Sequence, residues 1–281
     1  MGLQDARAQI REMLSGAGIE TAGREADWIL EHVTGLGRAR LLAAGNDPLS
    51  EKEIERLMEL AGRRARREPL QYLLGEVEFF GRAFRVGPGV LIPRPETELL
   101  VEEILRRLPP GGRILDAGTG SGVIAITVKA ECPGASVWAV DISEAALSRA
   151  SENALLHEAE VRFLHHDLRS EGRGELPIGL HVLASNPPYV PHADRPGLEP
   201  ELHHEPPEAL FVNRVEDFID ALARLGTEVL VEGGHLLIET HAPDAEDAVE
   251  ALRAHGYRQI EVLKDLAGLP RVLCGTRPPT E

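Results

Sequence analysis

The sequence predicts an α/β protein of the Rossmann-like kind, with a doubly wound, mostly parallel seven-stranded sheet and a small helical N-terminal domain. From residue 113 onward, strand-like runs alternate with helical runs, as in a sheet covered by helices on both faces. The first 75 residues instead carry apolar side chains at helical spacing. We therefore predict a helical domain over 1–75, a β-hairpin linker over 76–92 and an α/β domain over 93–281.

Composition excludes several classes of protein. The 281 residues are 43% hydrophobic, enough to build one large core and one small one. Two cysteines cannot form a disulfide framework, which favours a reducing cytoplasm, and no run reaches the roughly 18 apolar residues of a membrane span. A net charge of −16 repels the phosphate backbone, so we expect no direct nucleic-acid binding and no membrane attachment. We expect a monomer.

The N-terminal segment is predicted to form a small helical bundle. Ser50 with Glu53 three residues later is a capping-box pattern that begins one of its helices. Three apolar faces mark the helices, made by Leu3, Ile10 and Leu14, by Trp28, Ile29, Leu30 and Val33, and by Ile54, Leu57, Met58 and Ala61. A dense basic cluster follows, Arg63, Arg64, Arg66 and Arg67, which is either a solvated helix face or a binding patch.

The remaining elements follow in order. Aromatic and β-branched residues broken by glycines predict a hairpin between 75 and 92, and Pro95 is predicted in the first turn of the next helix. Seven strand-like runs then follow, over 113–116, 136–141, 160–164, 180–185, 235–240, 258–263 and 271–275.

A glycine-rich turn lies between the first of these strands and an apolar helix. Its residues are Asp116, Ala117, Gly118, Thr119, Gly120, Ser121 and Gly122. Glycines let the backbone turn sharply against a ligand, although a tight strand-helix connection alone would also need them. A dinucleotide fingerprint requires its third glycine where Val123 stands. The spacing instead fits the first motif of S-adenosylmethionine-dependent methyltransferases.

The next two strands end in acidic residues. Asp141 could accept both hydroxyl protons of an adenosine ribose, or could cap the helix that starts near Ser143. Asp167 could accept from the adenine amino group, with Leu168 against the ring. These endings share the carboxyl edge of the sheet, where open α/β sheets bind ligands.

An Asn-Pro-Pro-Tyr segment, residues 186–189, follows the fourth strand. Prolines lack an N–H, so the Asn186 side-chain oxygen and a carbonyl of Pro187 or Pro188 can act as acceptors for an NH₂ group. Tyr189 can stack on a planar acceptor. A proline-rich turn leaving a strand is the structural alternative. We predict Asn186, Pro187 and Tyr189 as catalytic residues, with Pro188 also binding the substrate.

The chain resembles the bacterial peptide-chain release factor glutamine methyltransferases (the HemK/PrmC family). The resemblance covers nearly the whole chain, and its most specific part is Pro93-Arg94-Pro95-Glu96-Thr97-Glu98. It also includes Glu68 to Tyr72, Glu78 to Gly81, Asp116 to Gly122, Asp141, Asn153, Asn186 to Tyr189, Glu205-Pro206 and Ala209-Leu210. It implies methylation of the glutamine side-chain amide in the Gly-Gly-Gln loop of release factors. It also implies cofactor contacts by Gly118 to Gly122, Asp141, Leu168 and Asn186.

Two positions depart from the family pattern. An aromatic residue often stands where this chain has Leu168, and a glycine-rich segment is expected where residues 211–218 lie. The second departure leaves the shape of one pocket wall open.

Rival readings share parts of these motifs. They are a glutamine methyltransferase for a ribosomal protein, an adenine-N6 DNA methyltransferase that flips its base, a nicotinamide oxidoreductase and a non-catalytic scaffold. The net charge and the glycine spacing disfavour the second and third. Two adjacent histidine pairs, 165–166 and 203–204, are interpreted as non-ligands, so no metal is predicted.

Substrate selection needs more surface than a pocket for one side chain, on the order of 1,000 Å². The N-terminal helices are predicted to supply it, with the arginine cluster as the charged contact. A chain beginning near Gly75 is accordingly expected to bind S-adenosylmethionine but to methylate intact release factor slowly.

Overall fold

The computed structural model describes residues 1–170, 172–241 and 244–279. The chain divides into two compact units. The first contains Met1–Glu76 together with the distant segment Glu199–His204, and the second contains Val77–Leu198 and the chain from Glu205 onward. Six residues of the segment predicted as the α/β domain therefore group with the N-terminal helices.

The first unit is a helical bundle of α1 (Leu3–Gly16), α2 (Ala22–Thr34), α3 (Arg38–Ala43), α4 (Glu51–Ala65) and α5 (Leu70–Leu74). Its core is built from the apolar faces of α1, α2 and α4, which bury Ile10, Leu14, Ile29, Leu30, Leu57 and Leu60 completely. The capping box is present, since Ser50 N donates to Glu53 Oε2 at 2.7 Å and Glu53 N donates to Ser50 Oγ at 3.3 Å. Both bonds satisfy N–H groups that the first helical turn leaves unpaired.

The arginine cluster at the end of α4 is not an open basic patch. Arg64 is only 6% exposed, and it donates to Glu25 at 2.6 Å and to Glu201 at 2.7 Å. Arg67 also donates to Glu201, at 2.9 Å, and Arg63 pairs with Glu68. Two strongly desolvated glutamates thus hold Arg64, and the predicted role of this cluster as a charged substrate contact is wrong for Arg64. The positive charge of Arg64 is neutralised by glutamates of the same unit.

A hairpin of β1 (Glu76–Phe79) and β2 (Arg82–Arg85) follows, and all of it except Glu76 belongs to the second unit. Phe80 N in its turn donates to Glu98 Oε1 at 2.7 Å, which ties the hairpin to α6 (Thr97–Arg107). Pro95 lies two residues before this helix and not within its first turn, since residues 95 and 96 form a turn in which Pro95 O accepts from Glu98 N.

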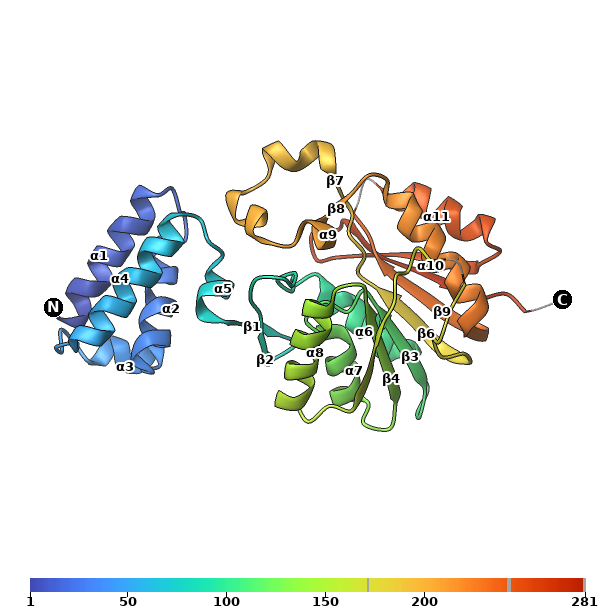
Figure 1. Ribbon diagram of the computed structural model, residues 1–281, viewed down its shortest axis with the longest axis horizontal. Helices are drawn as coiled ribbons and strands as arrows, with labels where there is room; N and C mark the ends of the chain where they lie inside the picture. Colours follow the sequence, from blue (N-terminus) through green and yellow to red (C-terminus); the bar gives the residue numbers. More distant parts are fainter. Residues whose placement is uncertain (171, 242–243, 280–281) are drawn as a thin grey trace. The chain divides into compact units, whose positions relative to one another are not determined.

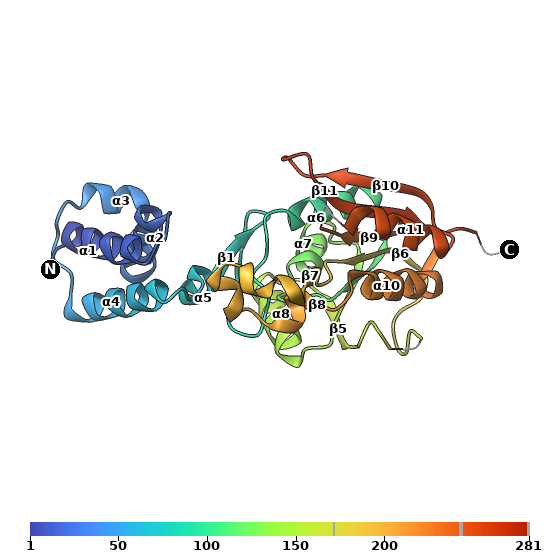
Figure 2. The ribbon, with the colours of Figure 1, turned by 90° about the horizontal axis from the view of Figure 1, so that it is seen from above.

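The sheet has seven strands in the order β10-β11-β9-β6-β3-β4-β5. The five strands β9-β6-β3-β4-β5 are parallel, and β11 pairs antiparallel with both β9 and β10. Figure 2 shows β10 and β5 at opposite edges. The strands are β3 (Arg113–Ala117), β4 (Ser136–Asp141), β5 (Val161–His165), β6 (Leu180–Ser185), β9 (Leu230–Glu239), β10 (Arg258–Lys264) and β11 (Pro270–Thr276).

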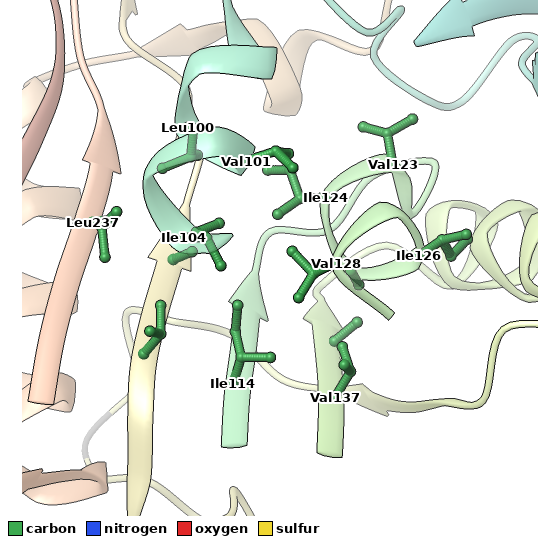
Figure 3. Close-up of a cluster of buried hydrophobic side chains, with 14 of the residues drawn as sticks. Leu100, Val101, Ile104, Ile114, Val123, Ile124, Ile126, Val128, Val137 and Leu237 are labelled. Atoms are coloured by element: carbon green, nitrogen blue, oxygen red, sulfur yellow. The ribbon is translucent and has the colours of Figure 1, made fainter. Parts of the chain in front are cut away.

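Helices cover both faces of this sheet (Figure 1). On one face lie α6, α7 (Val123–Glu131) and α8 (Glu144–Leu156), and on the other lie α10 (Val215–Val229) and α11 (Ala245–Ala254). Neighbouring strand residues alternate between the two cores, so Ile114 packs beneath α6 and α7 while Leu115 packs toward α10. Figure 3 shows the first core, with Leu100 and Ile104 of α6 above Ile114. The predicted doubly wound, mostly parallel fold is confirmed.

Within the described ranges, no helix combines the length and the apolar character that crossing a membrane requires.

Candidate active site

The turn between β3 and α7 is a left-handed glycine loop. Gly118, Gly120 and Gly122 have φ angles of 75°, 56° and 86°, a region that residues with a Cβ rarely adopt. A Cβ at Gly118 or Gly120 would meet open space, whereas one at Gly122 would lie 2.8 Å from Ile126 and 3.1 Å from Ala150. Gly122 therefore allows α7 and α8 to pack closely, and the first two glycines leave bare backbone beside the cavity.

Asp116 lies beneath this loop and does not line the cavity. It is fully buried, accepting from Thr119 Oγ1 at 2.6 Å and from Ala125 N at 3.2 Å, while its second oxygen has no partner among the described residues. Burial raises the pKa of Asp116 to about 7. This residue, predicted to bind the cofactor, is placed where it fixes the shape of the loop instead.

Asp141 holds the loop from the end of β4. Its two carboxylate oxygens accept from Gly120 N and from Ser143 N, both at 2.9 Å. The helix cap is supplied by Ser143, whose hydroxyl accepts from Ala146 N, so Asp141 is not the N-cap of α8. Burial raises the pKa of Asp141, and the nearby Glu208 contributes in the same direction. Each oxygen keeps a further lone pair that can face the cavity.

Asp167 and Leu168 follow β5 and line the same cavity. Burial alone would raise the pKa of Asp167, but hydrogen bonds from Arg169 outweigh it and lower the pKa. The backbone N–H of Arg169 donates to Asp167 at 2.9 Å, and its guanidinium lies over the ring of Phe218, 5.6 Å from the centroid. Asp167 is therefore an ionised acceptor whose oxygens are partly occupied.

The cavity has a volume of about 310 Å³ and lies at the carboxyl edge of the parallel strands. Among the predicted residues it brings together Gly118, Thr119, Gly120, Ser121, Asp141, Asp167, Leu168, Asn186, Pro187 and Pro188. This size suits a nucleoside-sized ligand together with one side chain. Asp116, Gly122 and Tyr189 are not on its wall.

Asn186 follows β6, and its amide is oriented by a neighbour. Asn186 Nδ2 donates to Thr97 Oγ1 at 3.2 Å, at the start of α6. With the NH₂ group engaged, Oδ1 remains as an acceptor. Ser185 Oγ donates to Ala117 O at 2.7 Å and thereby joins the end of β6 to the glycine loop.

Tyr189, which is predicted to stack on the acceptor, is not on the cavity wall. Its ring stacks on His241, with centroids 5.9 Å apart and planes 8° from parallel, and it packs against the core beneath α10. Burial raises the pKa of its hydroxyl, with a further contribution from Glu239. The phenol therefore stays neutral in this position.

The segment that departs from the family pattern forms one wall. Phe211–Val212 is strand β8, paired in parallel with β7 (Val190–Pro191) after the short helix α9 (Pro207–Leu210). The Phe211 ring stacks on His192, with centroids 5.5 Å apart. The guanidinium of Arg195 lies over the same ring, 5.3 Å from its centroid.

Other cavity residues had no signal of their own in the sequence. Examples are Ile142, directly after Asp141, and also His192 and Glu208. Thr97 lies inside the Pro-Arg-Pro-Glu-Thr-Glu segment, so that motif could have indicated it. Among the described residues, no group of three or more His, Cys, Asp or Glu is arranged to hold a metal ion.

Two family models match the chain. Residues 5–75 match the model described as the PrmC N-terminal domain, and residues 95–211 match the methyltransferase small domain. A methyltransferase from Pyrococcus furiosus has the same fold, with a TM-score of 0.54 and 20% identity over 78% of this chain and 100% of that one. Fold and site thus define a Rossmann-like class I methyltransferase.

Relatives narrow the class to a family. A release factor glutamine methyltransferase from Neisseria gonorrhoeae is 42% identical over 89% of this chain and 92% of its own length. One from Deinococcus radiodurans is 39% identical over 99% of both chains. The chain belongs to the release factor glutamine methyltransferase family.

Proposed function

We propose that this enzyme transfers the methyl group of S-adenosylmethionine to the side-chain amide nitrogen of the glutamine in the Gly-Gly-Gln motif of peptide-chain release factors. Asn186 carries the proposal, because its NH₂ group is held by Thr97 and its oxygen is left as an acceptor beside the glycine loop. The names of the relatives support the choice of substrate.

The chemistry explains why acceptors are needed. An amide nitrogen is a weak nucleophile because its lone pair is delocalised into the carbonyl group. Asn186 Oδ1 and the Pro187 carbonyl would each accept a hydrogen bond from one N–H of this amide. The two bonds would favour a pyramidal nitrogen and hold it in line with the methyl group. The amide nitrogen would gain the methyl group as the methyl–sulfur bond breaks, which leaves S-adenosylhomocysteine as the second product. It would lose one proton to water, so the methylated product is a neutral N-methyl amide.

Purified release factor provides the direct test. Incubation with methyl-labelled cofactor should label one glutamine, which mass spectrometry would locate in the Gly-Gly-Gln motif. Labelling of a ribosomal protein in place of a release factor would favour the rival glutamine substrate.

We further propose that S-adenosylmethionine binds with its methionine part along Gly118 to Ser121 and its ribose on Asp141. The adenine would lie between Ile142 and Leu168, with Asp167 as the acceptor for its amino group. Bare glycine backbone, a carboxylate and two aliphatic side chains on one wall fit those three parts of the molecule. When bound, the cofactor supplies an activated methyl group and no metal is needed.

Asp141→Ala is expected to weaken S-adenosylmethionine binding by about 1.5–3 kcal/mol, the usual value of hydrogen bonds to a charged acceptor. Titration calorimetry measures this directly. Asp141→Asn keeps the side-chain volume and should lose less. Unchanged affinity in Asp141→Ala would show that Asp141 does not bind the ribose. Its role would then be to support the glycine loop.

We also propose that the N-terminal unit recognises the protein substrate. Its Trp28 is 42% exposed on α2, with the Arg24 guanidinium 5.9 Å from the ring centroid. Exposed tryptophans are frequent energetic centres of interfaces. Truncation near Gly75 is an unsuitable test, because Glu201 would lose Arg64 and Arg67.

Trp28→Ala is expected to lower kcat/KM for intact release factor by roughly tenfold, because a central interface residue contributes more than 1 kcal/mol. Methylation of a short Gly-Gly-Gln peptide should be unaffected, since the peptide reaches only the cavity. Comparing both substrates under the same conditions gives the measurement. An equal loss on both, or none on either, would contradict recognition through this residue.

A further inference from the structure

Glu239, at the end of β9, is a buried carboxyl without an evident structural role. It is 1% exposed, and neither of its oxygens has a completed hydrogen bond among the described residues. The nearby Thr97 hydroxyl nevertheless favours the ionised form of this carboxyl. A buried polar group left unsatisfied destabilises the fold, so an apolar residue would stabilise this position better. Its presence calls for a functional explanation.

The sheet register places Glu239 beside the proposed acceptor residue. Strands β6 and β9 are parallel, and Ser185 pairs with Ile238. The next residues along these strands are Asn186 and Glu239. Thr97 interacts with both, since its hydroxyl accepts from Asn186 Nδ2 and influences the Glu239 carboxyl. These three residues therefore form a chain of polar groups that ends at the cavity.

We propose that Glu239 is a positioning residue that acts through Thr97 to set the orientation of the Asn186 amide. This inference rests on the proposed function of Asn186. An ionised Glu239 can only accept, so the freely rotating Thr97 hydroxyl donates to it. The Thr97 oxygen then accepts Asn186 Nδ2–H, and Asn186 Oδ1 faces the glutamine NH₂ group. A protonated Glu239 instead donates to Thr97.

The protonated state allows the opposite arrangement. The Thr97 hydroxyl hydrogen is then free to donate to Asn186 Oδ1, which turns the amide and directs its NH₂ group toward the substrate NH₂ group. Two sets of donors would face each other, and the substrate would lose an acceptor. The productive orientation thus belongs to the ionised carboxyl, so the rate of methyl transfer should rise with pH.

Burial raises the pKa of Glu239 from 4.5 to about 7, which puts this switch near neutrality. The charged groups that influence it come from the elements packed against it. Arg271 on β11 and Arg94 before α6 lower the pKa, whereas Glu96 raises it. Tyr189 after β6 is also close, because Glu239 raises the pKa of its hydroxyl.

The test is the pH dependence of single-turnover methylation of a Gly-Gly-Gln peptide at saturating cofactor. Saturating cofactor removes any effect of pH on cofactor affinity from the measured rate. This matters because the pKa of Asp116, beneath the glycine loop, is also about 7. The wild-type rate should rise from pH 6 to pH 8 with a midpoint near 7. Glu239→Gln mimics the protonated carboxyl, so its rate should be independent of pH and at least about tenfold below the wild-type plateau.

Further variants separate positioning from general damage. Thr97→Val should also abolish the pH dependence, and the double variant should be no slower than either single one, because both break the same link. Thr97→Ser keeps the hydroxyl and should restore the pH dependence. Glu103→Gln is the matched control, since Glu103 is equally buried on α6 but pairs with Arg106 and Arg107. It should keep the wild-type profile.

A flat wild-type profile would overturn the inference without any variant. A Glu239→Gln profile that still rises through pH 7 would also overturn it, and if Asn186→Ala is then inactive, the proposed function survives. Full activity in Asn186→Ala would instead remove the acceptor assignment on which the inference rests.

Discussion

Asn186→Ala is expected to slow single-turnover methyl transfer by on the order of a hundredfold or more while changing cofactor affinity far less. The removed oxygen is proposed to orient and polarise the amide only as it reacts, and loss of one such preorganised partner commonly costs that much in rate. Rapid-quench measurement at saturating cofactor gives the rate, and calorimetry gives the affinity. A rate near that of wild type would show that the acceptor site is elsewhere.

Asn186→Asp serves as the matched comparison. Aspartate keeps oxygen acceptors at the same position but cannot donate to Thr97 Oγ1 as Asn186 Nδ2 does. Its rate should lie between those of wild type and Asn186→Ala. The comparison separates the acceptor oxygen from the hydrogen bond that orients it.

Arg64→Ala is expected to destabilise the N-terminal unit by about 3–5 kcal/mol, because it leaves the buried Glu25 without a cationic partner and leaves Glu201 with Arg67 alone. Glu25 and Glu201 have side chains only 8% and 16% exposed, and both pair with Arg64. Urea denaturation followed by Trp28 fluorescence, in a Trp138→Phe background, would report on this unit alone, since the chain has two tryptophans.

Arg56→Ala is the control on the same helix. Arg56 and Glu59 form an exposed pair at 2.7 Å, with side chains 43% and 51% exposed, and such pairs contribute about 1 kcal/mol or less. A similar midpoint shift in both variants would mean that the buried network contributes no more than a surface pair.

Much of the fold could be predicted because the sheet and the main helices have strong local patterns. All seven strands of the sheet are present, and the capping box at Ser50 begins a helix. Strand β9 starts at Leu230, earlier than the apolar run from His235 predicts, because Gly233 and Gly234 interrupt that pattern. The helices α3 and α5 are only 6 and 5 residues long. They are too short for their apolar residues to show a clear helical periodicity.

The residues that line the cavity could be predicted where a strand end carries its own residue type, as at Asp141 and Asn186. A residue's role could not be predicted where it depends on packing between distant segments. Glu239 resembles any strand residue until the register of β6 and β9 places it beside Asn186. Tyr189 is the kind of residue that stacks on a planar ligand, yet one face of its ring stacks on His241. Local sequence carries no information about such partners.

The segment Glu199–His204 belongs to the N-terminal unit, and this affects how the chain folds as it is synthesised. Arg64 and Glu201 are 137 residues apart in sequence. At about 5–20 residues per second, a ribosome needs about 7–27 s to pass from one to the other. The helices can collapse early and Arg64 can pair with Glu25, but its second carboxylate partner, Glu201, is absent during that interval. The first unit to emerge therefore stays incomplete until four of the seven sheet strands, β3 to β6, have been translated.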